Sequence, residues 1–469
     1  MQTFFKQRNA KAVSKFTDKN ARIRAKQVIV KHGVGIKRSD QRLIKTSKPA
    51  VTLNDESRAI LDLLENTDTN VILTGRAGTG KSTLIQYFRA TTNKKLAVLA
   101  PTGVAAVNIQ GQTIHSFCKF RPGITVAQVK RLGSQETALI RDLETIIIDE
   151  ISMVRADLFD CFERFMRLHG PDSSQPFGGV QIIAVGDLYQ LPPIVTRDEM
   201  EIFSETYPSP FFFDAHCFES AGFHKITLSQ VYRQNDPEFV ELLDAIRIGQ
   251  IEDRHLELIN RQYRSDYQEE SMVVNLVSTN AMADRINQAK LDLLPGSARQ
   301  YQGALSGDFN EQSLPTHGIL KLKVGAQVML LNNDSSGRWI NGDLAQVIAM
   351  DGASIRVAFS DGTYDDIMPY TWERVRFVRD DDGAIGSQVV GSFTQLPIRL
   401  AWAVTIHKGQ GQTFDKAVID FGDRTFAAGQ AYVALSRCKT LSGLILKCPL
   451  ERRHVFIDQR IKFFLEQNS

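Results

Sequence analysis

The sequence predicts an α/β protein whose mostly parallel sheet is covered by helices on both faces. Short apolar runs at residues 71–74, 96–100 and 145–148 alternate with segments of helical periodicity. A glycine-rich loop joins the first run to a helix, in the order strand, tight loop, helix. Between residues 320 and 393, four Asn-Gly or Asp-Gly pairs indicate hairpins. We therefore expect a small antiparallel β-barrel inserted into an α/β pattern that resumes after it.

The chain begins with a basic segment. Residues 1–50 hold 14 Lys and Arg against two acidic residues, a net charge of +12, which leaves −9 for the remaining chain. We expect this arm to be disordered and to bind nucleic-acid phosphates. A solvated tail without a specific role and an organelle transit peptide are the alternatives.

Length and composition exclude several classes of protein. The 469 residues are enough for about two to four domains. There is no apolar run of about 18 residues and no apolar signal region at the start, so we expect neither a membrane span nor a secretory signal. The five cysteines are scattered and never spaced C-x-x-C, which argues for a reducing compartment and against structural zinc.

The glycine-rich loop at residues 75–82 follows the pattern G-x-x-x-x-G-K-[ST]. Backbone N–H groups of such a loop turn toward a phosphate, and the next helix adds partial positive charge at its N-terminus. Lys81 is expected to reach the β and γ phosphates and Ser82 to bind Mg²⁺. A chance turn is the alternative, which the flanking strand and helix disfavour. The predicted nucleotide-binding residues are Gly75, Arg76, Ala77, Gly78, Thr79, Gly80, Lys81, Ser82 and Thr83.

Two carboxylates, Asp149 and Glu150, close the apolar strand 145–148. We expect Asp149 to hold Mg²⁺ and Glu150 to orient or deprotonate the attacking water. Gln190 follows the next strand and is placed to sense the γ-phosphate, although it could be a polar turn residue before Pro192. Arg233 and Arg437 are candidates for stabilising transition-state charge, since arginine binds oxygens through a planar fork. Either arginine alone is more often a surface or ion-paired residue.

Seven short motifs follow one another along the chain: residues 75–82, 147–154 (Ile-Ile-Asp-Glu-Ile-Ser-Met-Val), 176–183 (Pro-Phe-Gly-Gly-Val-Gln-Ile-Ile), 186–193 (Gly-Asp-Leu-Tyr-Gln-Leu-Pro-Pro), 231–234 (Val-Tyr-Arg-Gln), 405–413 (Thr-Ile-His-Lys-Gly-Gln-Gly-Gln-Thr) and 430–437 (Gln-Ala-Tyr-Val-Ala-Leu-Ser-Arg). Their order resembles that of superfamily 1B helicases, and the sequence most resembles the petite-integration-frequency helicases with their RecD-like and phage relatives. The resemblance covers the chain from about Leu53 to the C-terminus, including a helix from Asp157 to Arg167 that resembles a family-specific segment.

The resemblance implies two RecA-like domains with ATP in the cleft between them, at residues 51–225 and 226–469. The first would carry a wedge insertion at about 117–135, and the second an inserted barrel of Src-homology type at about 320–393. It further implies an ATP- and Mg²⁺-dependent DNA helicase that moves 5′ to 3′ on single-stranded DNA and unwinds duplex at junctions. Such enzymes serve DNA replication, repair, recombination and telomere maintenance.

The resemblance also assigns individual residues. Arg233 and Arg437 would be arginine fingers that complete the site on closure, with Tyr232 against the adenine and Gly411 in the nucleotide site. Residues matching DNA-contacting positions are Thr102, His115, Thr405, His407 and Lys408, and the wedge adds Phe117, Phe120 and Pro122 as base-stacking candidates. The alternatives are satisfied loop hydroxyls, exposed basic residues and hydrophobes that bury the loop.

Two positions depart from the family pattern: Ser57 stands where relatives carry an adenine-reading Gln, and Gly409 where they carry Ser. Selectivity for ATP is therefore open. We expect a monomer that binds no membrane, in the cytoplasm of a bacterial or phage-infected cell, or in a mitochondrion or nucleus if the host is eukaryotic. The rival functions are a kinase or remodelling ATPase, a translocase or RNA-directed unwinder, and an inactive DNA-binding helicase fold. A kinase or remodelling ATPase would share the glycine-rich loop but not the motifs at residues 405–413 and 430–437.

Overall fold

The computed structural model describes residues 53–467, apart from residues 122, 196, 235, 269, 310–313, 335, 380–384, 422–424 and 426. The predicted basic arm at residues 1–50, the wedge candidate Pro122 and the Asp382-Gly383 turn lie outside the described residues. None of the helices in the described part is long and apolar enough to cross a membrane.

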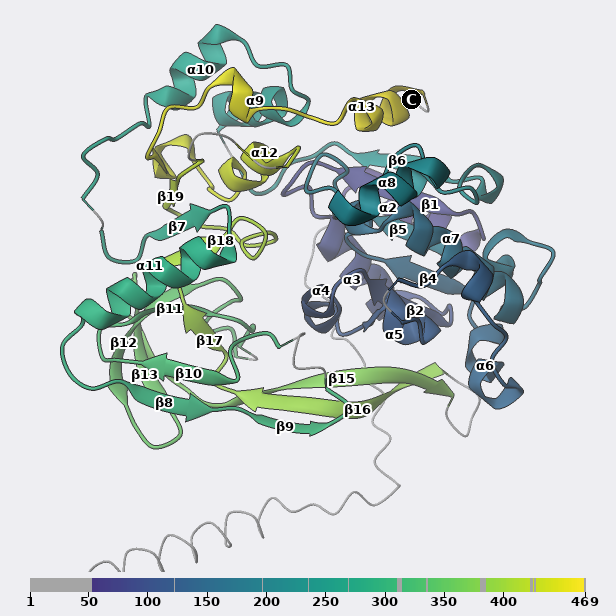
Figure 1. Ribbon diagram of the computed structural model, residues 1–469, viewed down its shortest axis with the longest axis horizontal. Coiled ribbons are helices and arrows are strands. Elements are labelled where there is room, and N and C mark those ends of the chain that lie inside the picture. The colour runs from purple at the N-terminus through teal and green to yellow at the C-terminus, as the bar shows by residue number, and fades with distance from the viewer. Residues whose placement is uncertain are drawn as a thin grey trace, which may run out of the picture. The chain divides into compact units, whose positions relative to one another are not determined.

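The first sheet has six parallel strands in the order β3-β2-β4-β5-β1-β6 (Figure 1). Its strands are β1 (Val71–Gly75), β2 (Leu96–Ala100), β3 (Gln112–Thr113), β4 (Thr145–Ile148), β5 (Gln181–Val185) and β6 (His224–Leu228). The order places β1, which carries the glycine-rich loop, between β5 and β6. The predicted parallel α/β architecture is confirmed.

Both faces of this sheet are buried, which explains why its strands read as unbroken apolar runs. In β4, Ile147 packs with α2 (Asp55–Asn66) and α3 (Lys81–Thr91). Its neighbours Ile146 and Ile148 belong to the hydrophobic cluster on the other face of the sheet. That cluster includes residues of α5 (Ile114–Cys118), α6 (Ser134–Arg141) and α7 (Ala156–His169).

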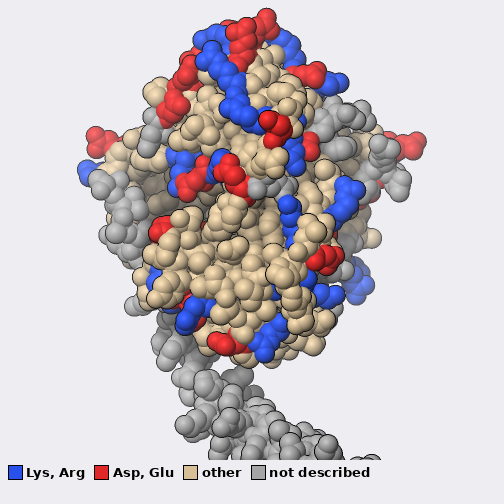
Figure 2. Space-filling model, turned by 90° about the vertical axis from the view of Figure 1, so that its left-hand side faces the viewer, with Lys and Arg blue, Asp and Glu red and all other residues tan. Residues whose placement is uncertain are grey.

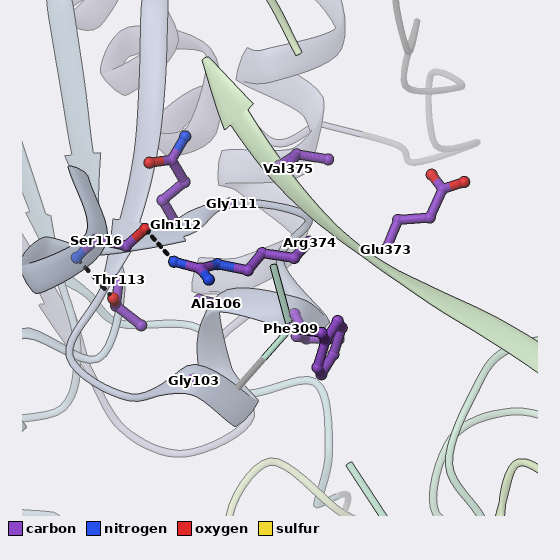
Figure 3. Close-up of a pocket in the computed structure, with 11 residues that line it drawn as sticks. Gly103, Ala106, Gly111, Gln112, Thr113, Ser116, Phe309, Glu373, Arg374 and Val375 are labelled. Atoms are coloured by element: carbon purple, nitrogen blue, oxygen red, sulfur yellow. Dashed lines mark hydrogen bonds between the residues drawn. The ribbon is translucent and has the colours of Figure 1, made fainter. Parts of the chain in front are cut away.

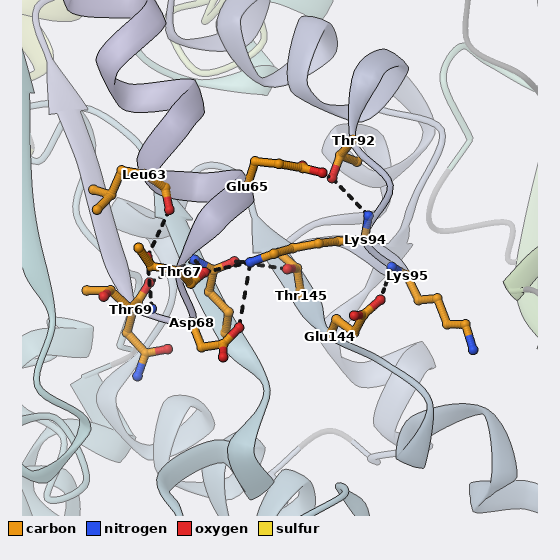
Figure 4. A network of polar contacts seen from close by, with 12 residues as sticks. Leu63, Glu65, Thr67, Asp68, Thr69, Thr92, Lys94, Lys95, Glu144 and Thr145 are labelled. Atoms are coloured by element: carbon orange, nitrogen blue, oxygen red, sulfur yellow. Dashed lines mark hydrogen bonds and ion pairs between the residues drawn. The ribbon is translucent and has the colours of Figure 1, made fainter.

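The amino end of the sheet is closed by a polar network (Figure 4). Lys94 Nζ donates to Thr67 O (2.6 Å) and Gln181 Oε1 (3.0 Å), and Gln181 Nε2 donates to the carbonyls of Thr67 and Thr69 (both 3.0 Å). Gln181 is buried in β5, so these bonds satisfy an amide that would otherwise be costly to bury. The carboxyl ends of the strands are left to carry the functional loops.

The segment 117–135, expected as a wedge, packs on α7. Phe117 is 8% exposed, and the rings of Phe117 and Phe120 lie edge-on to Phe165 at 6.3 and 5.7 Å between centroids. These contacts favour the alternative in which both rings bury the loop. Stacking of either ring on a DNA base stays a prediction.

The second sheet is parallel as well, in the order β18-β7-β19-β20. Its strands are β7 (Val274–Val277), β18 (Ala403–Thr405), β19 (Ala417–Ile419) and β20 (Leu444–Leu446). The helices of this half are α9 (Pro237–Arg247), α10 (Asp253–Asn260), α11 (Asn280–Leu293) and α12 (Gln430–Leu435). The last helix, α13 (Gln459–Gln467), returns to the half of the chain that holds the first sheet. There the ring of Phe464 stacks on that of Phe213, with 4.2 Å between the ring centroids.

Antiparallel strands interrupt the second half between β7 and β18, as the hairpin signals predict. One sheet has the order β14-β13-β12-β11-β17, a second is the ribbon β15-β16-β9, and β8 pairs with β10. The strands are β8 (Arg299–Gln302), β9 (Ala304–Gly307), β10 (Ile319–Leu322), β11 (Gln327–Leu330), β12 (Leu344–Met350), β13 (Ile355–Phe359), β14 (Tyr364–Ile367), β15 (Tyr370–Arg379), β16 (Ile385–Gln395) and β17 (Ile398–Leu400). The block thus begins before and ends after the expected residues 320–393.

Candidate functional site

The glycine-rich loop connects β1 to α3 and is shaped by positive φ angles. Gly78 has φ +83°, and a Cβ there would lie 2.4 Å from the Cβ of Arg233, so glycine is required. Lys81 Nζ donates to the carbonyls of Gly75 (2.7 Å) and Arg76 (2.9 Å). The Lys81 side chain thus folds back along the glycine-rich loop, with its ammonium group bonded to the loop carbonyls. Burial lowers the pKa of Lys81, and nearby carboxylates oppose that shift.

Asp149 and Glu150 follow β4, and the backbone N–H of Glu150 donates to Asp149 Oδ1 (3.0 Å). Glu150 has φ +52°, a left-handed conformation that is uncommon outside glycine. Burial, and then the neighbouring charge of Asp149, raise the pKa of Glu150 to about 7, while Lys81 lowers it. Burial likewise raises the pKa of Asp149. A carboxylate with a pKa near 7 is suited to accept a proton at physiological pH.

Gln410 brings the second half of the chain to these groups. Its Nε2 donates to Glu150 Oε2 (3.0 Å) and to Gln190 Oε1 (2.9 Å). Gln190 is 8% exposed, and its own Nε2 lies 3.5 Å from Asp187 Oδ2. One amide therefore joins the expected general base to the expected γ-phosphate sensor.

The two predicted arginine fingers lie together beside the loop. Arg233 contacts Gly78 at the loop and donates to Ser436 O (3.5 Å). Arg437, 1% exposed, donates through Nε to Val433 O (2.8 Å). Burial, and then the charge of Arg233, lower the pKa of Arg437 to about 9. The charges of Tyr432 and Glu150 oppose that shift.

A buried ion pair crosses the same region and was not predicted. Asp187, 1% exposed, accepts from Arg247 Nη2 (3.1 Å) and from the hydroxyl of Tyr432 (3.0 Å). The Tyr432 oxygen also accepts from the backbone N–H of Ala77 in the loop (2.8 Å). Arg247 covers the ring of Tyr189 at 4.6 Å. Asp187 and Tyr432 stand inside the recognised motifs, but nothing in the sequence around Arg247 marks it.

A groove with a volume of about 850 Å³ runs past Glu150. Its lining includes predicted site residues from three separate parts of the sequence: Thr102, Glu150, and His407 with Lys408. Thr405 also lines it, although it is 3% exposed and its hydroxyl accepts from Lys408 N (3.2 Å).

Figure 2 shows that on one face of the molecule basic and acidic side chains lie interspersed.

Arg399 lines the same groove and was missed by sequence reasoning. Burial lowers its pKa to about 10. Its Nη2 donates to Pro315 O (3.0 Å), whereas its buried Nε has no hydrogen-bond partner among the described residues. The groove is therefore lined by a largely buried cation that the sequence does not mark.

Predicted His115 does not line this groove. It lies in α5, and burial lowers its pKa. The adjacent Ser116 accepts from Arg374 Nη2 of β15 (2.9 Å), and Arg374 also pairs with Asp308 (2.6 Å). Figure 3 shows this contact at a small cavity of about 100 Å³. The antiparallel ribbon is thereby joined to the first half beside the groove.

Tyr232 and Gly411 complete the predicted nucleotide residues. Tyr232 N–H donates to Gly78 O (2.8 Å), and its ring lies beside Gly80, where an added Cβ would be 3.6 Å from the ring. Gly411 has φ +80° and nothing within 4 Å of an added Cβ. At Gly409 an added Cβ would meet its nearest atom at 3.4 Å, so the backbone does not demand glycine there.

Comparison with known proteins supplies the family context. A family model described as PIF1-like helicase matches residues 52–257. ATP-dependent DNA helicase Pif1 of Bdellovibrio bacteriovorus is 33% identical over 433 residues, covering 89% of this chain and 92% of that protein. Human ATP-dependent DNA helicase PIF1 is 34% identical over 420 residues, covering 86% of this chain and 61% of the human protein. The chain thus spans less than two thirds of that longer relative.

Solved structures similar to this chain are also Pif1 helicases. Bacteroides Pif1 in complex with ADP-AlF4 matches with a TM-score of 0.82 and 36% identity, covering 89% of this chain and 97% of that one. Bacteroides Pif1 with ADP-AlF3 and single-stranded DNA matches with a TM-score of 0.65 at the same identity and coverage.

Proposed function

The chain belongs to the PIF1-like helicase family, and on that premise we propose that it is an ATP-dependent DNA helicase that moves 5′ to 3′ on single-stranded DNA. It hydrolyses ATP at the glycine-rich loop and binds the DNA strand in the groove lined by Thr102, His407, Lys408 and Arg399. The observation that carries the proposal is Gln410, which lines that groove and hydrogen-bonds to Glu150 and Gln190.

The phosphate site is assembled from both halves of the chain. Lys81 leaves the loop carbonyls to bind the β and γ phosphates, with backbone N–H groups of the loop around them. Glu150 accepts the proton of the attacking water, which Gln190 orients, and the arginines at 233 and 437 stabilise charge on the γ-phosphoryl oxygens. Hydrolysis thus depends on how the second half of the chain is seated against the first.

The ligand types fit Mg²⁺. The Ser82 hydroxyl and the Asp149 carboxylate are hard oxygen donors, as that ion requires. In the described part of the chain no group of three or more His, Cys, Asp or Glu could hold a metal by itself. The remaining ligands would be phosphate oxygens and water, the usual arrangement for this ion. When bound, Mg²⁺ neutralises charge on the phosphates.

The decisive experiment measures unwinding of duplexes that carry a 5′ or a 3′ single-stranded tail, in DNA and in RNA. We expect ATP-dependent unwinding of the 5′-tailed DNA duplex, with little on the 3′-tailed one. Lys81→Ala is the matched inactive control and should abolish DNA-stimulated hydrolysis and unwinding together. Unwinding from the 3′ tail would overturn the polarity, and preference for RNA would overturn the substrate class. The monomeric state and the cellular location stay predictions.

A further inference from the structure

Three polar side chains meet beside the glycine-rich loop, outside the groups used for hydrolysis. Asn54, the N-cap of α2, donates through Nδ2 to Gln230 Oε1 (2.9 Å) and to the Tyr232 oxygen (3.3 Å). The Tyr232 hydroxyl in turn donates to Gln230 Oε1 (2.9 Å). Segments about 176 residues apart are thus joined at one point.

The position of Tyr232 relates this cluster to the nucleotide. Its backbone is bonded to Gly78 and its ring borders Gly80, at the start of the helix whose first residues bind the phosphates. Tyr232 as a whole residue is 54% exposed, so its ring is open to stacking on a base. The base end of a bound nucleotide therefore lies at the ring, within reach of the amides on its far side.

The hydrogen bonds orient the Gln230 amide. Because Oε1 accepts from two donors, Nε2 is the end turned outward, and it has no partner among the described residues. A primary amide matches adenine by donating to N7 and accepting from the N6 amino group. When Tyr232 stacks on the base, its hydroxyl leaves Oε1, which frees the acceptor that N6 requires. Guanine presents the acceptor O6 at that point, which would face Oε1 without a proton between them.

We propose that Gln230 reads the adenine of the bound nucleotide and that Asn54 holds its amide in the reading orientation. This assignment rests on the proposed ATPase function and deepens it, since it names the group that sets base selectivity. Ser57, where the family pattern would place a reading Gln, has a side chain too short for that task. Its backbone N–H instead donates to Asn54 Oδ1 (2.8 Å) and so supports the residue that orients Gln230.

The test is equilibrium binding of fluorescent ADP and GDP to the full chain in the presence of Mg²⁺. Wild type should bind ADP at least tenfold more tightly than GDP. Gln230→Ala should weaken ADP binding about tenfold while GDP binding stays within twofold, since one good amide pair discriminates by roughly this factor. For ATP hydrolysis, KM should rise and kcat should change little, because the base is bound equally in ground and transition states.

The controls separate this role from a general one. Ser229→Ala alters the adjacent exposed residue, whose hydroxyl donates to Glu56 (3.2 Å), and should leave the ADP to GDP ratio unchanged. Gln230→Glu keeps the shape but removes the donor, so it should lose ADP affinity as the alanine variant does. An unchanged ratio in Gln230→Ala, an equal loss of both nucleotides, or a wild type that does not discriminate would each overturn the proposal. A wild type that binds neither nucleotide would instead overturn the proposed function.

Discussion

Gln410 Nε2 lies 3.0 Å from Glu150 Oε2 and 2.9 Å from Gln190 Oε1, so a residue that lines the groove is hydrogen-bonded to both groups expected to hold the attacking water. An amide nitrogen carries two hydrogens, and both bonds use them. While these bonds last, Glu150 Oε2 and Gln190 Oε1 are engaged by Gln410 rather than by water. Movement of the loop that carries Thr405, His407 and Lys408 would release them.

Gln410→Ala should therefore raise ATP hydrolysis in the absence of DNA and reduce the factor by which single-stranded DNA stimulates it. We expect a severalfold rise in the basal rate, with the DNA-saturated rate changed less. Steady-state hydrolysis measured with and without an oligonucleotide checks this. Lys416→Ala, which removes a surface ion pair with Glu270 just beyond the same loop, is the control. A basal rate that falls with the stimulated rate would mean that Gln410 helps the reaction directly.

The pH dependence of hydrolysis follows from Glu150. Burial and the charge of Asp149 raise the pKa of Glu150 to about 7 in the free protein, so below pH 7 the carboxyl is protonated and cannot accept a proton. The value of kcat/KM for ATP, which reports the free enzyme, should fall up to tenfold per pH unit on the acid side of pH 7. Measurement from pH 5.5 to 8.5 at constant ionic strength checks this. A profile that is flat down to pH 5.5 would contradict the assignment of Glu150 as the base.

Much of the fold could be predicted because its signals are local. The apolar runs of β1, β4 and β5, and the Asn-Gly and Asp-Gly turns, follow from neighbouring residues alone. The extent of the antiparallel block could not be read in this way. Its outer strands β8 and β17 pair with strands distant in sequence, and their hydrophobic patterns are short.

The site shows the same division. Lys81 and Asp149 lie in motifs where spacing and chemistry agree, and the structure brings them to one edge of the first sheet. Arg247 and Arg399 could not be found from the sequence, because each is defined by what surrounds it in space. Arg247 pairs with the buried carboxylate of Asp187, and Arg399 lines the groove. Phe117 shows how a site residue can be predicted where the structure has a core residue. An aromatic residue in a loop has the same local sequence pattern whether it contacts a base or the core, and Phe117 belongs to the core cluster.

Arg399 should contribute to DNA affinity. Its side chain lines the groove, and with a pKa lowered by burial only to about 10 it is still charged at neutral pH, so a phosphate in the groove would gain a charged donor. Arg399→Ala should weaken binding of single-stranded DNA about tenfold and lessen the slope of log Kd against log salt by about 0.7. Fluorescence anisotropy at several salt concentrations measures both. Arg254→Ala, an exposed arginine paired with Glu241 away from the groove, should change neither. An unchanged salt slope would mean that Arg399 meets no phosphate.

Removal of one partner from the buried pair of Asp187 and Arg247 should destabilise the contact between the two halves of the chain. Burial acts to raise the pKa of Asp187, but Arg247, Lys81 and the Tyr432 hydroxyl together hold it below its usual value, so the carboxylate is charged at neutral pH. Asp187→Ala would leave the Arg247 charge buried without a partner, at a cost of about 3–5 kcal/mol, whereas replacing both partners by apolar residues is often close to neutral. The double variant Asp187→Leu/Arg247→Met should therefore unfold at a higher temperature than Asp187→Ala in a thermal melt. Arg356→Ala, which breaks an exposed ion pair with Asp366, should shift the melt little. If the double variant were no more stable than Asp187→Ala, the loss would come from the Tyr432 and Gln190 contacts of Asp187 rather than from an uncompensated charge.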